Sequence, residues 1–228
     1  MSATGSAELK EKEFGPARLR LDWRILVSLL VILLAVLISV LWGVRQKTQE
    51  GYCGFRLFPL KDAYNFDLID QNGRPFQLSQ LNGKVALFTF GFTHCPNICP
   101  TTLMDLATVC KALPAVDRNR VQILFISVDP GRDRPEVLKN YIPYFDPGIV
   151  GLTGPKDAID RAVNAYGASY EISRQPGDAP GVYTVNHSAF TYLVNPQRKL
   201  ELIYDYEKLT DTKGIVSDIE KVLHERGG

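Results

Sequence analysis

Twenty consecutive residues without a charge, Ile25 to Val44, constrain this chain more than any other segment. At 1.5 Å per residue, a helix of that length measures about 30 Å, which matches the hydrocarbon thickness of a bilayer. A signal-peptide core is shorter and ends at a small-residue cleavage site, and neither feature occurs here. A buried core helix would require amphipathicity or a much larger protein around it. We therefore predict a single transmembrane helix over residues 25–44.

The flanks of this segment predict its orientation. Residues 1–24 mix acidic with basic side chains, whereas organelle transit peptides are poor in acidic residues, so this range is interpreted as a short cytoplasmic tail. Three arginines lie in residues 18–24, and Arg45 and Lys47 follow the apolar run. This small excess favours a cytoplasmic tail and an external C-terminal part. We expect a bacterial cytoplasmic (inner) membrane protein with its soluble domain facing the periplasm, rather than one of the mitochondrial inner membrane.

The remainder is interpreted as a tether over residues 45–60 and one domain over 61–228, a length within the usual range for a single domain. The formal net charge of the chain is +1, which gives no electrostatic case for binding nucleic acid. Four cysteines are too few for a disulfide-stapled scaffold.

Apolar periodicity and turn residues divide this domain into alternating strands and helices. The alternation predicts an α/β sandwich with a mixed sheet. The predicted elements are hairpins over 66–78 and 189–204, strands at 84–92, 121–128 and 149–152, helices at 100–113, 135–145, 155–166 and 211–225, and an inserted loop or hairpin over 167–186.

The strand at 84–92 leads directly to Cys95 and Cys99, each followed by a proline. A residue before proline favours an extended backbone, so both cysteines are expected on a taut loop, with Pro100 as the first residue of the next helix. Cys99 then lies at a helix N-terminus, where the macrodipole favours the thiolate. Two thiols in this position indicate a soft-metal site or a redox-active pair that cycles with a disulfide.

Two further residues are expected at the same edge of the sheet. Asp129 follows the strand at 121–128, and parallel strands bring their carboxyl ends together. It is interpreted either as a helix N-cap or as a hydrogen-bond acceptor for a ligand residue. His187 precedes a strand, so it can reach this edge only if the strand at 189–194 runs antiparallel to the others. Two thiolates and one imidazole suit copper(I) and tolerate copper(II) or zinc, although zinc would normally take a fourth ligand.

In these features the chain resembles the Sco/SenC family of copper proteins, which assemble respiratory oxidases. The resemblance covers residues 64–223. It is carried by Gly91-Phe92-Thr93-His94-Cys95-Pro96-Asn97-Ile98-Cys99-Pro100, by Ser127-Val128-Asp129-Pro130 with Arg132, Asp133 and Pro135, and by Asn186-His187-Ser188.

The resemblance implies a thioredoxin-like domain in which Cys95, Cys99 and His187 bind one copper ion. It also implies delivery of that copper to the binuclear centre of cytochrome c oxidase, with the copper-bearing oxidase subunit as partner. Other periplasmic copper chaperones or thiol reductases are further candidate partners. Family members usually carry an aspartate where this chain has Asn97, which removes one negative charge beside the site without changing a ligand.

Two functions of different classes compete. The first is a membrane-anchored copper chaperone, a binding protein rather than an enzyme, with thiol–disulfide reductase activity as an auxiliary function. The second is a thiol–disulfide oxidoreductase that reduces the copper-ligand cysteines of the oxidase subunit. The three-residue spacer between Cys95 and Cys99 speaks against the second as the sole function, because thioredoxin motifs use two. A peroxidase is a weaker alternative, because no Thr-x-x-Cys element precedes Cys95. A structural assembly factor with a degenerated site is a third alternative, and the three intact ligands argue against it.

Overall fold

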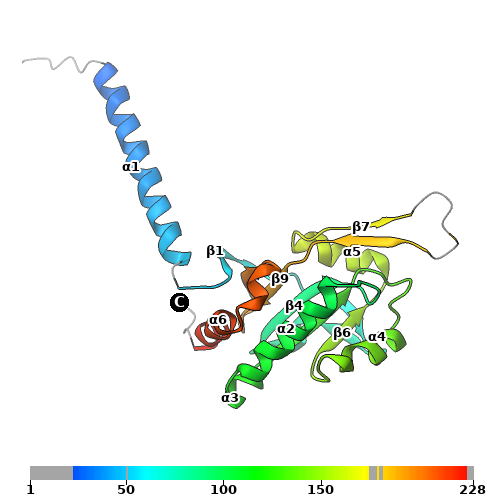
Figure 1. Cartoon of the computed structure of the whole chain (residues 1–228). Coiled ribbons are helices and arrows are strands. Elements are labelled where there is room, and N and C mark those ends of the chain that lie inside the picture. The colour runs from blue at the N-terminus through cyan, green and yellow to red at the C-terminus, as the bar shows by residue number, and fades with distance from the viewer. Residues whose placement is uncertain (1–22, 50, 175–178, 180–181, 225–228) are drawn as a thin grey trace, which may run out of the picture. The chain divides into compact units, whose positions relative to one another are not determined.

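The computed structural model describes residues 23–49, 51–174, 179 and 182–224 (Figure 1). The chain divides into two compact units, Met1–Arg45 and Gln46–Gly228. Most of the predicted cytoplasmic tail, residues 1–22, lies outside the described residues.

The first unit is built on a single long helix, α1 (Trp23–Gln49). Within the described part of the chain, its segment Trp23–Gly43 is the one stretch that is long and apolar enough to cross a membrane. Its large apolar side chains are exposed rather than packed against protein, from Trp23 to Trp42. A helix with apolar residues on every side requires an apolar surrounding, which is what a bilayer provides. α1 is therefore a candidate transmembrane span.

The second unit is organised around an eight-stranded mixed sheet with the order β1-β10-β9-β4-β5-β6-β2-β3. β4, β5 and β6 are parallel, and the strands that flank them are antiparallel. This arrangement confirms the predicted α/β class. The strands are β1 (Phe55–Asp62), β2 (Asp67–Asp70), β3 (Pro75–Gln77), β4 (Val85–Gly91), β5 (Val121–Ser127), β6 (Val150–Thr153), β9 (Thr191–Val194) and β10 (Lys199–Tyr204).

Helices cover both faces of this sheet. The α-helices are α2 (Ile98–Ala112), α3 (Ala115–Arg118), α4 (Pro135–Tyr141), α5 (Lys156–Ala165) and α6 (Thr212–His224), with short 3-10 turns η1 (Leu78–Leu81), η2 (Ile142–Tyr144) and η3 (Glu207–Thr210). On one face, Leu87 of β4 and Leu106 of α2 line the same small apolar pocket as Ile219 of α6. On the other, Tyr166 at the end of α5 meets the Phe88 ring at 4.8 Å between centroids. Successive side chains of β4 thus serve opposite faces.

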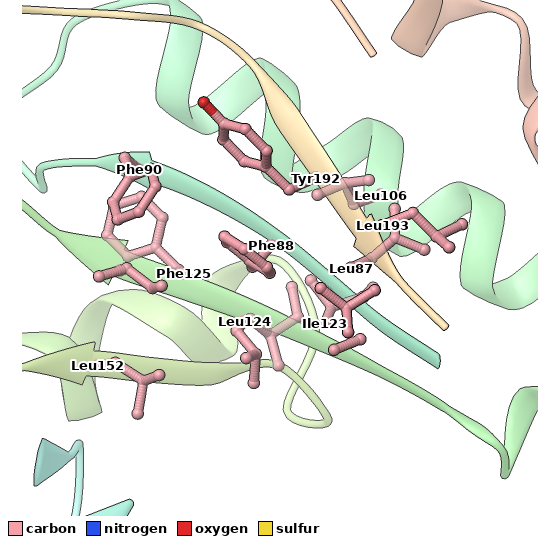
Figure 2. Close-up of a cluster of buried hydrophobic side chains, with 14 of the residues drawn as sticks. Leu87, Phe88, Phe90, Leu106, Ile123, Leu124, Phe125, Leu152, Tyr192 and Leu193 are labelled. Carbon is pink, nitrogen blue, oxygen red and sulfur yellow. The ribbon is translucent and has the colours of Figure 1, made fainter. Parts of the chain in front are cut away.

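The centre of the sheet is buried on both sides. Every residue of β4 is buried, and Phe88 stacks on Tyr192 of the neighbouring β9 at 5.3 Å between ring centroids. Figure 2 shows these two rings together with Phe90 and Phe125 in the hydrophobic core. A strand that is apolar on both faces reads as a continuous apolar run, which is why residues 84–92 could be assigned from sequence.

A separate two-stranded hairpin carries the last predicted ligand. β7 (Tyr170–Ser173) pairs antiparallel with β8 (Thr184–His187), so Tyr170 lies opposite His187. The predicted insertion over 167–186 is therefore a hairpin.

The structure differs from the sequence expectation at the start of the domain. Residues 45–60 were interpreted as a tether, but β1 begins at Phe55 and pairs with β10 at the edge of the main sheet. Its side chains are exposed or half-buried throughout, so the strand leaves no alternating apolar pattern to detect. Its proline, Pro59, is tolerated because an edge strand leaves one row of backbone groups unpaired.

Candidate metal centre

The two cysteines lie at the carboxyl end of β4, on either side of the start of α2. Cys95 lies in a turn, and its backbone N–H donates to the Phe92 carbonyl at 3.2 Å. Helix α2 begins at Ile98, so Pro100 is its third residue and not its first, and Cys99 lies inside the first turn rather than on the loop. The N–H of Cys99 is free of the helical ladder at this position and points to the Cys95 sulfur, 3.5 Å away.

His187 reaches these thiols from the hairpin. β9 runs antiparallel to β4, with Thr191 opposite Thr89, which is the strand direction that the sequence argument required. One ligand atom from each of Cys95, Cys99 and His187 lies within 4.8 Å of the other two. Cys99 Sγ lies 3.3 Å from His187 Nε2. The structure thus brings together the three residues predicted as metal ligands.

The imidazole of His187 is oriented by its own surroundings. Its Nδ1–H donates to the Ser188 carbonyl at 3.1 Å, so Nε2 is the nitrogen that faces Cys99. The Phe92 and His187 rings lie perpendicular to each other, with 5.7 Å between their centroids and 90° between their planes. The hairpin is closed beside it by the Ser188 N–H, which donates to the Ser169 carbonyl at 2.9 Å. These contacts present Nε2 of the imidazole to the thiols.

The two thiols have opposite acidities. The pKa of Cys95 lies well below that of an ordinary thiol, because the Cys99 thiol and then the backbone N–H groups of Cys99 and Asn97 donate to its sulfur. The pKa of Cys99 is raised, first by its bond to the Cys95 thiolate and second by burial, since its side chain is 2% exposed. The metal-free pair therefore holds one proton and one negative charge, with the charge on the more accessible sulfur.

Gly91 makes room for this arrangement. A Cβ added at residue 91 would lie 2.7 Å from both the Cys99 sulfur and the Phe125 ring. Real Cβ atoms do not approach other atoms so closely, so any larger residue would displace the sulfur or the ring. The position requires glycine for space rather than for an unusual backbone angle.

Asp133 is the functional residue that reasoning from single residues missed. Its carboxylate, which is fully buried, accepts hydrogen bonds from the N–H and hydroxyl of Thr93 at 2.9 and 2.6 Å and from the Ser127 hydroxyl at 2.6 Å. Thr93 opens the cysteine loop and Ser127 ends β5, so this carboxylate fastens the loop to the next strand. The only sequence signal was its place within the family motif.

Asp129 serves a different contact from the one expected. Its carboxylate accepts hydrogen bonds from the Arg132 guanidinium and from the Tyr183 hydroxyl, the latter at 2.6 Å. Among the described hydrogen bonds, none joins this carboxylate to the three predicted ligands. Asp129 thus contacts the hairpin next to Thr184, where β8 begins, rather than the imidazole itself.

Asn97 and the remaining cysteines do not add a ligand. Asn97 occupies the N-cap position of α2 without a side-chain capping bond, and all four cysteines are free thiols. Cys53 and Cys110 are half-buried, and the metal-binding group found in the described residues contains neither.

Comparison with known proteins identifies the family. The SCO1/SenC family model matches residues 59–224, which is most of the second unit. The chain belongs to the SCO1/SenC family. An SCO2-like protein of Rickettsia felis is 35% identical over 177 residues, covering 77% of this chain and 84% of that protein.

Two solved Sco structures share this fold. Apo Sco1 of Thermus thermophilus is 39% identical with a TM-score of 0.69, over 75% of this chain and 96% of that one. Yeast Sco1 with copper bound is 34% identical with a TM-score of 0.65, over 73% of this chain and 91% of that one. The expected thioredoxin-like domain is confirmed. Sco proteins take part in cytochrome c oxidase assembly and bind copper.

Proposed function

We propose that this SCO1/SenC protein is a membrane-anchored copper chaperone that delivers copper to the binuclear copper centre of cytochrome c oxidase during its assembly. The observation that carries the proposal is the convergence of Cys95, Cys99 and His187, whose ligand atoms lie within 4.8 Å of one another. Copper is the cargo of this site. The copper-bearing subunit of the oxidase is the proposed recipient, and other periplasmic copper chaperones or thiol reductases are proposed as further partners.

The donor set fits copper(I). Thiolates are the soft ligands that this ion prefers, imidazole is compatible with it, and three donors suit its low coordination number. Cys95 already carries negative charge in the metal-free protein, so only the Cys99 proton has to leave when copper(I) enters. The contact of His187 Nδ1 with the Ser188 carbonyl orients the ring so that Nε2 is the nitrogen available to the metal. The same three residues also allow copper(II).

The location proposed for this activity follows from α1 and its flanks. A candidate span at Trp23–Gly43 would anchor the copper-binding domain in the bacterial inner membrane. The small arginine excess before the span supports a periplasmic domain. In this position the domain would meet an oxidase subunit whose copper centre lies outside the cytoplasm.

Anaerobic titration of the full-length chain in detergent with copper(I) tests the proposal. We expect one copper ion per chain, with binding weakened by Cys95→Ala, Cys99→Ala and His187→Ala. Cys110→Ala is the matched control, because this half-buried thiol lies outside the ligand group. The proposal fails if the wild-type chain binds no copper, or if the three ligand substitutions affect binding no more than the control does.

One observation favours thiol–disulfide exchange as a second function of the same pair. The more accessible sulfur, Cys95, has the lowered pKa, and the buried Cys99 beside it is suited to resolve a mixed disulfide. In that reaction the Cys95 thiolate attacks a substrate disulfide, forms a mixed disulfide with one substrate sulfur and releases the other as a thiolate. Cys99 then loses its proton and attacks the Cys95 sulfur, which releases the second substrate thiolate and closes the Cys95–Cys99 disulfide, so the substrate is reduced by two electrons and the pair is oxidised. Turnover of a disulfide substrate without metal, with His187→Ala unaffected, would place this function first.

A further inference from the structure

A cluster of three side chains beside the metal centre joins the loop after β5 to the hairpin. Asp129 accepts hydrogen bonds from Arg132 Nε and from the Tyr183 hydroxyl, and Arg132 Nη1 donates to the Tyr183 carbonyl at 3.1 Å. The guanidinium also lies 3.7 Å from the centroid of the Tyr183 ring. We call Asp129, Arg132 and Tyr183 the clasp, because they hold both the backbone and the side chain of Tyr183.

The contacts of the clasp are of the stronger kinds. Asp129 is 1% exposed, and the Arg132 side chain is 20% exposed, so the charged pair is largely shielded from water. Hydrogen bonds between ionised groups are roughly twice as strong as neutral ones, and a desolvated guanidinium over a ring adds to them. Arg174 offers an internal contrast: it lies 5.5 Å from the same ring and is exposed.

Two routes lead from the clasp to the imidazole. Tyr183 directly precedes β8, and His187 is the last residue of that strand. Arg132 also lies 5.8 Å from the centroid of Phe92, whose ring meets the His187 ring edge to face. Both routes reach His187. The Phe92 carbonyl also accepts the Cys95 N–H, and the cysteine loop has a further anchor in Asp133, which the route through Tyr183 does not touch.

We infer that Arg132 is a positioning residue for His187, and that the clasp sets how the imidazole approaches the two thiols. The inference rests on the proposed copper ligation by His187. When the clasp is closed, all three donors converge. When it opens, the hairpin loses its hold at Tyr183, and copper keeps its two thiolate ligands without the imidazole. The clasp thereby governs the one ligand that can leave while the metal stays bound.

Copper(I) competition titrations of the full-length chain in detergent test this inference. Groups hydrogen-bonded directly to a metal ligand typically contribute 10–100-fold in affinity, and Arg132 acts on His187 only through Tyr183 and Phe92, so we expect a loss of up to about 10-fold for Arg132→Met. Tyr183→Phe keeps the ring but loses the bond to Asp129, so its loss should be smaller. Arg174→Met is the matched control and should leave the affinity unchanged. Equal effects of Arg132→Met and the control would overturn the inference.

A double-substitution test separates positioning from general stability. If Arg132 acts through the imidazole, Arg132→Met should cause no further loss of affinity in a His187→Ala background. A loss of the same size in both backgrounds would show that Arg132 acts elsewhere. If Arg132→Met does not fold, Arg132→Lys and Tyr183→Phe provide the same comparison.

The metal-free protein provides a readout that does not depend on copper. Arg132→Met should shift the NMR signals of the His187 ring and speed hydrogen exchange of the β8 amides, whereas Arg174→Met should do neither. If the wild type binds no copper, the proposed function fails, but the NMR and hydrogen-exchange measurements still test whether the clasp positions His187. Unchanged His187 signals in Arg132→Met would overturn the clasp itself.

Discussion

Gly91 shows how closely the metal centre depends on the size of single residues. An alanine there would place a methyl group 2.7 Å from both the Cys99 sulfur and the Phe125 ring. Since the sulfur is buried against the end of β4, we expect Gly91→Ala to cost about 1–3 kcal/mol of stability and to weaken copper binding. Denaturant unfolding and copper(I) titration measure the two effects.

Gly131→Ala is the matched control for that substitution. A Cβ at residue 131 would meet its nearest atoms at 3.6 and 3.7 Å, which is ordinary van der Waals contact. It should therefore leave stability nearly unchanged. If Gly91→Ala is as harmless as Gly131→Ala, the sulfur is not confined as described.

The acidities of the thiols predict the pH dependence of alkylation in the metal-free protein. Because the pKa of Cys95 is lowered, its thiolate persists at acidic pH, and iodoacetamide should modify it well below the ordinary thiol pKa of about 8.5. Cys53 is an internal control: burial and then the Asp211 carboxylate raise its pKa to about 11, so it should react only under alkaline conditions. Mass spectrometry of digests taken across a pH series separates the two. Parallel pH profiles would refute the assignment.

The same shift has a consequence for stability. A lowered pKa means that the folded state favours the Cys95 thiolate, so its stabilisation is present above the ordinary thiol pKa and is lost as the pH falls through the lowered value. The free energy of unfolding should therefore fall less steeply with decreasing pH in Cys95→Ser than in the wild type, because the substitution removes this titrating thiol.

At the scale of elements, the hairpin is the part of the site with the least support from the main sheet. Outside the clasp, its base is tied to α5 by the Tyr170 hydroxyl, which donates to Asp160 at 2.6 Å, and Tyr170 lies opposite His187. Losing this bond should cost about 1 kcal/mol. We expect Tyr170→Phe to speed hydrogen exchange of the β7 and β8 amides about fivefold, with β4 and β5 unaffected.

Tyr144→Phe removes the same hydroxyl at a side chain that is 85% exposed, so it serves as the control. It should leave hairpin exchange unchanged. Uniformly faster exchange across the sheet in Tyr170→Phe would mean that the hairpin is not a separate unit of local opening.

The elements that could be predicted from sequence are those whose local pattern coincides with their burial. β4 and β5 are buried almost throughout and read as apolar runs, and the Cys95–Cys99 spacing follows one of them directly. The strand and the cysteine spacing needed only information carried by neighbouring residues. The arrival of His187 was conditional on an antiparallel strand at 189–194, and the three-residue ligand set was implied by the family resemblance.

The features that escaped prediction depend on contacts between distant segments. β1 has an exposed face and an unpaired edge, so its own residues do not specify a strand, and it is pairing with β10 that makes this segment extended. The clasp joins Asp129 to Tyr183 across 54 positions, and Tyr183 follows a stretch rich in glycine and proline. The start of α2 before Pro100 also differs, because the cap position was inferred from the proline alone.

At the scale of the whole second unit, the sheet places the site where the chain enters the domain. Phe55, at the start of β1, pairs with Ile203 near the end of β10, and β10 ends beside the start of β9. The start of β9 lies beside the end of β4, which carries the cysteine loop. The start of β1 and the cysteine loop therefore lie at the same end of the strands of this sheet.

In the proposed function α1 is the membrane anchor, so its orientation determines on which side of the membrane the whole domain functions, and the flanking charges predict that orientation. Only cations close to a span count strongly, and residues 18–24 carry three arginines against Arg45 and Lys47 on the other flank. We expect protease added to spheroplasts to digest the domain of the wild-type chain, because the proposed orientation places that domain outside the cytoplasm. Replacing the three arginines by alanine reverses the excess, so part of the population should become protected.

The matched control removes the same amount of charge far from the span, by alanine substitution of Lys84, Lys139 and Lys213, which are exposed residues of the domain. Their loss should leave protease access unchanged, because charges in long translocated segments have little influence on orientation. A wild-type domain protected in spheroplasts would contradict the periplasmic assignment while leaving the copper site intact. A domain released by alkaline carbonate would instead argue against α1 as an anchor, since an apolar span of about 30 Å is held by the bilayer core and not by charge.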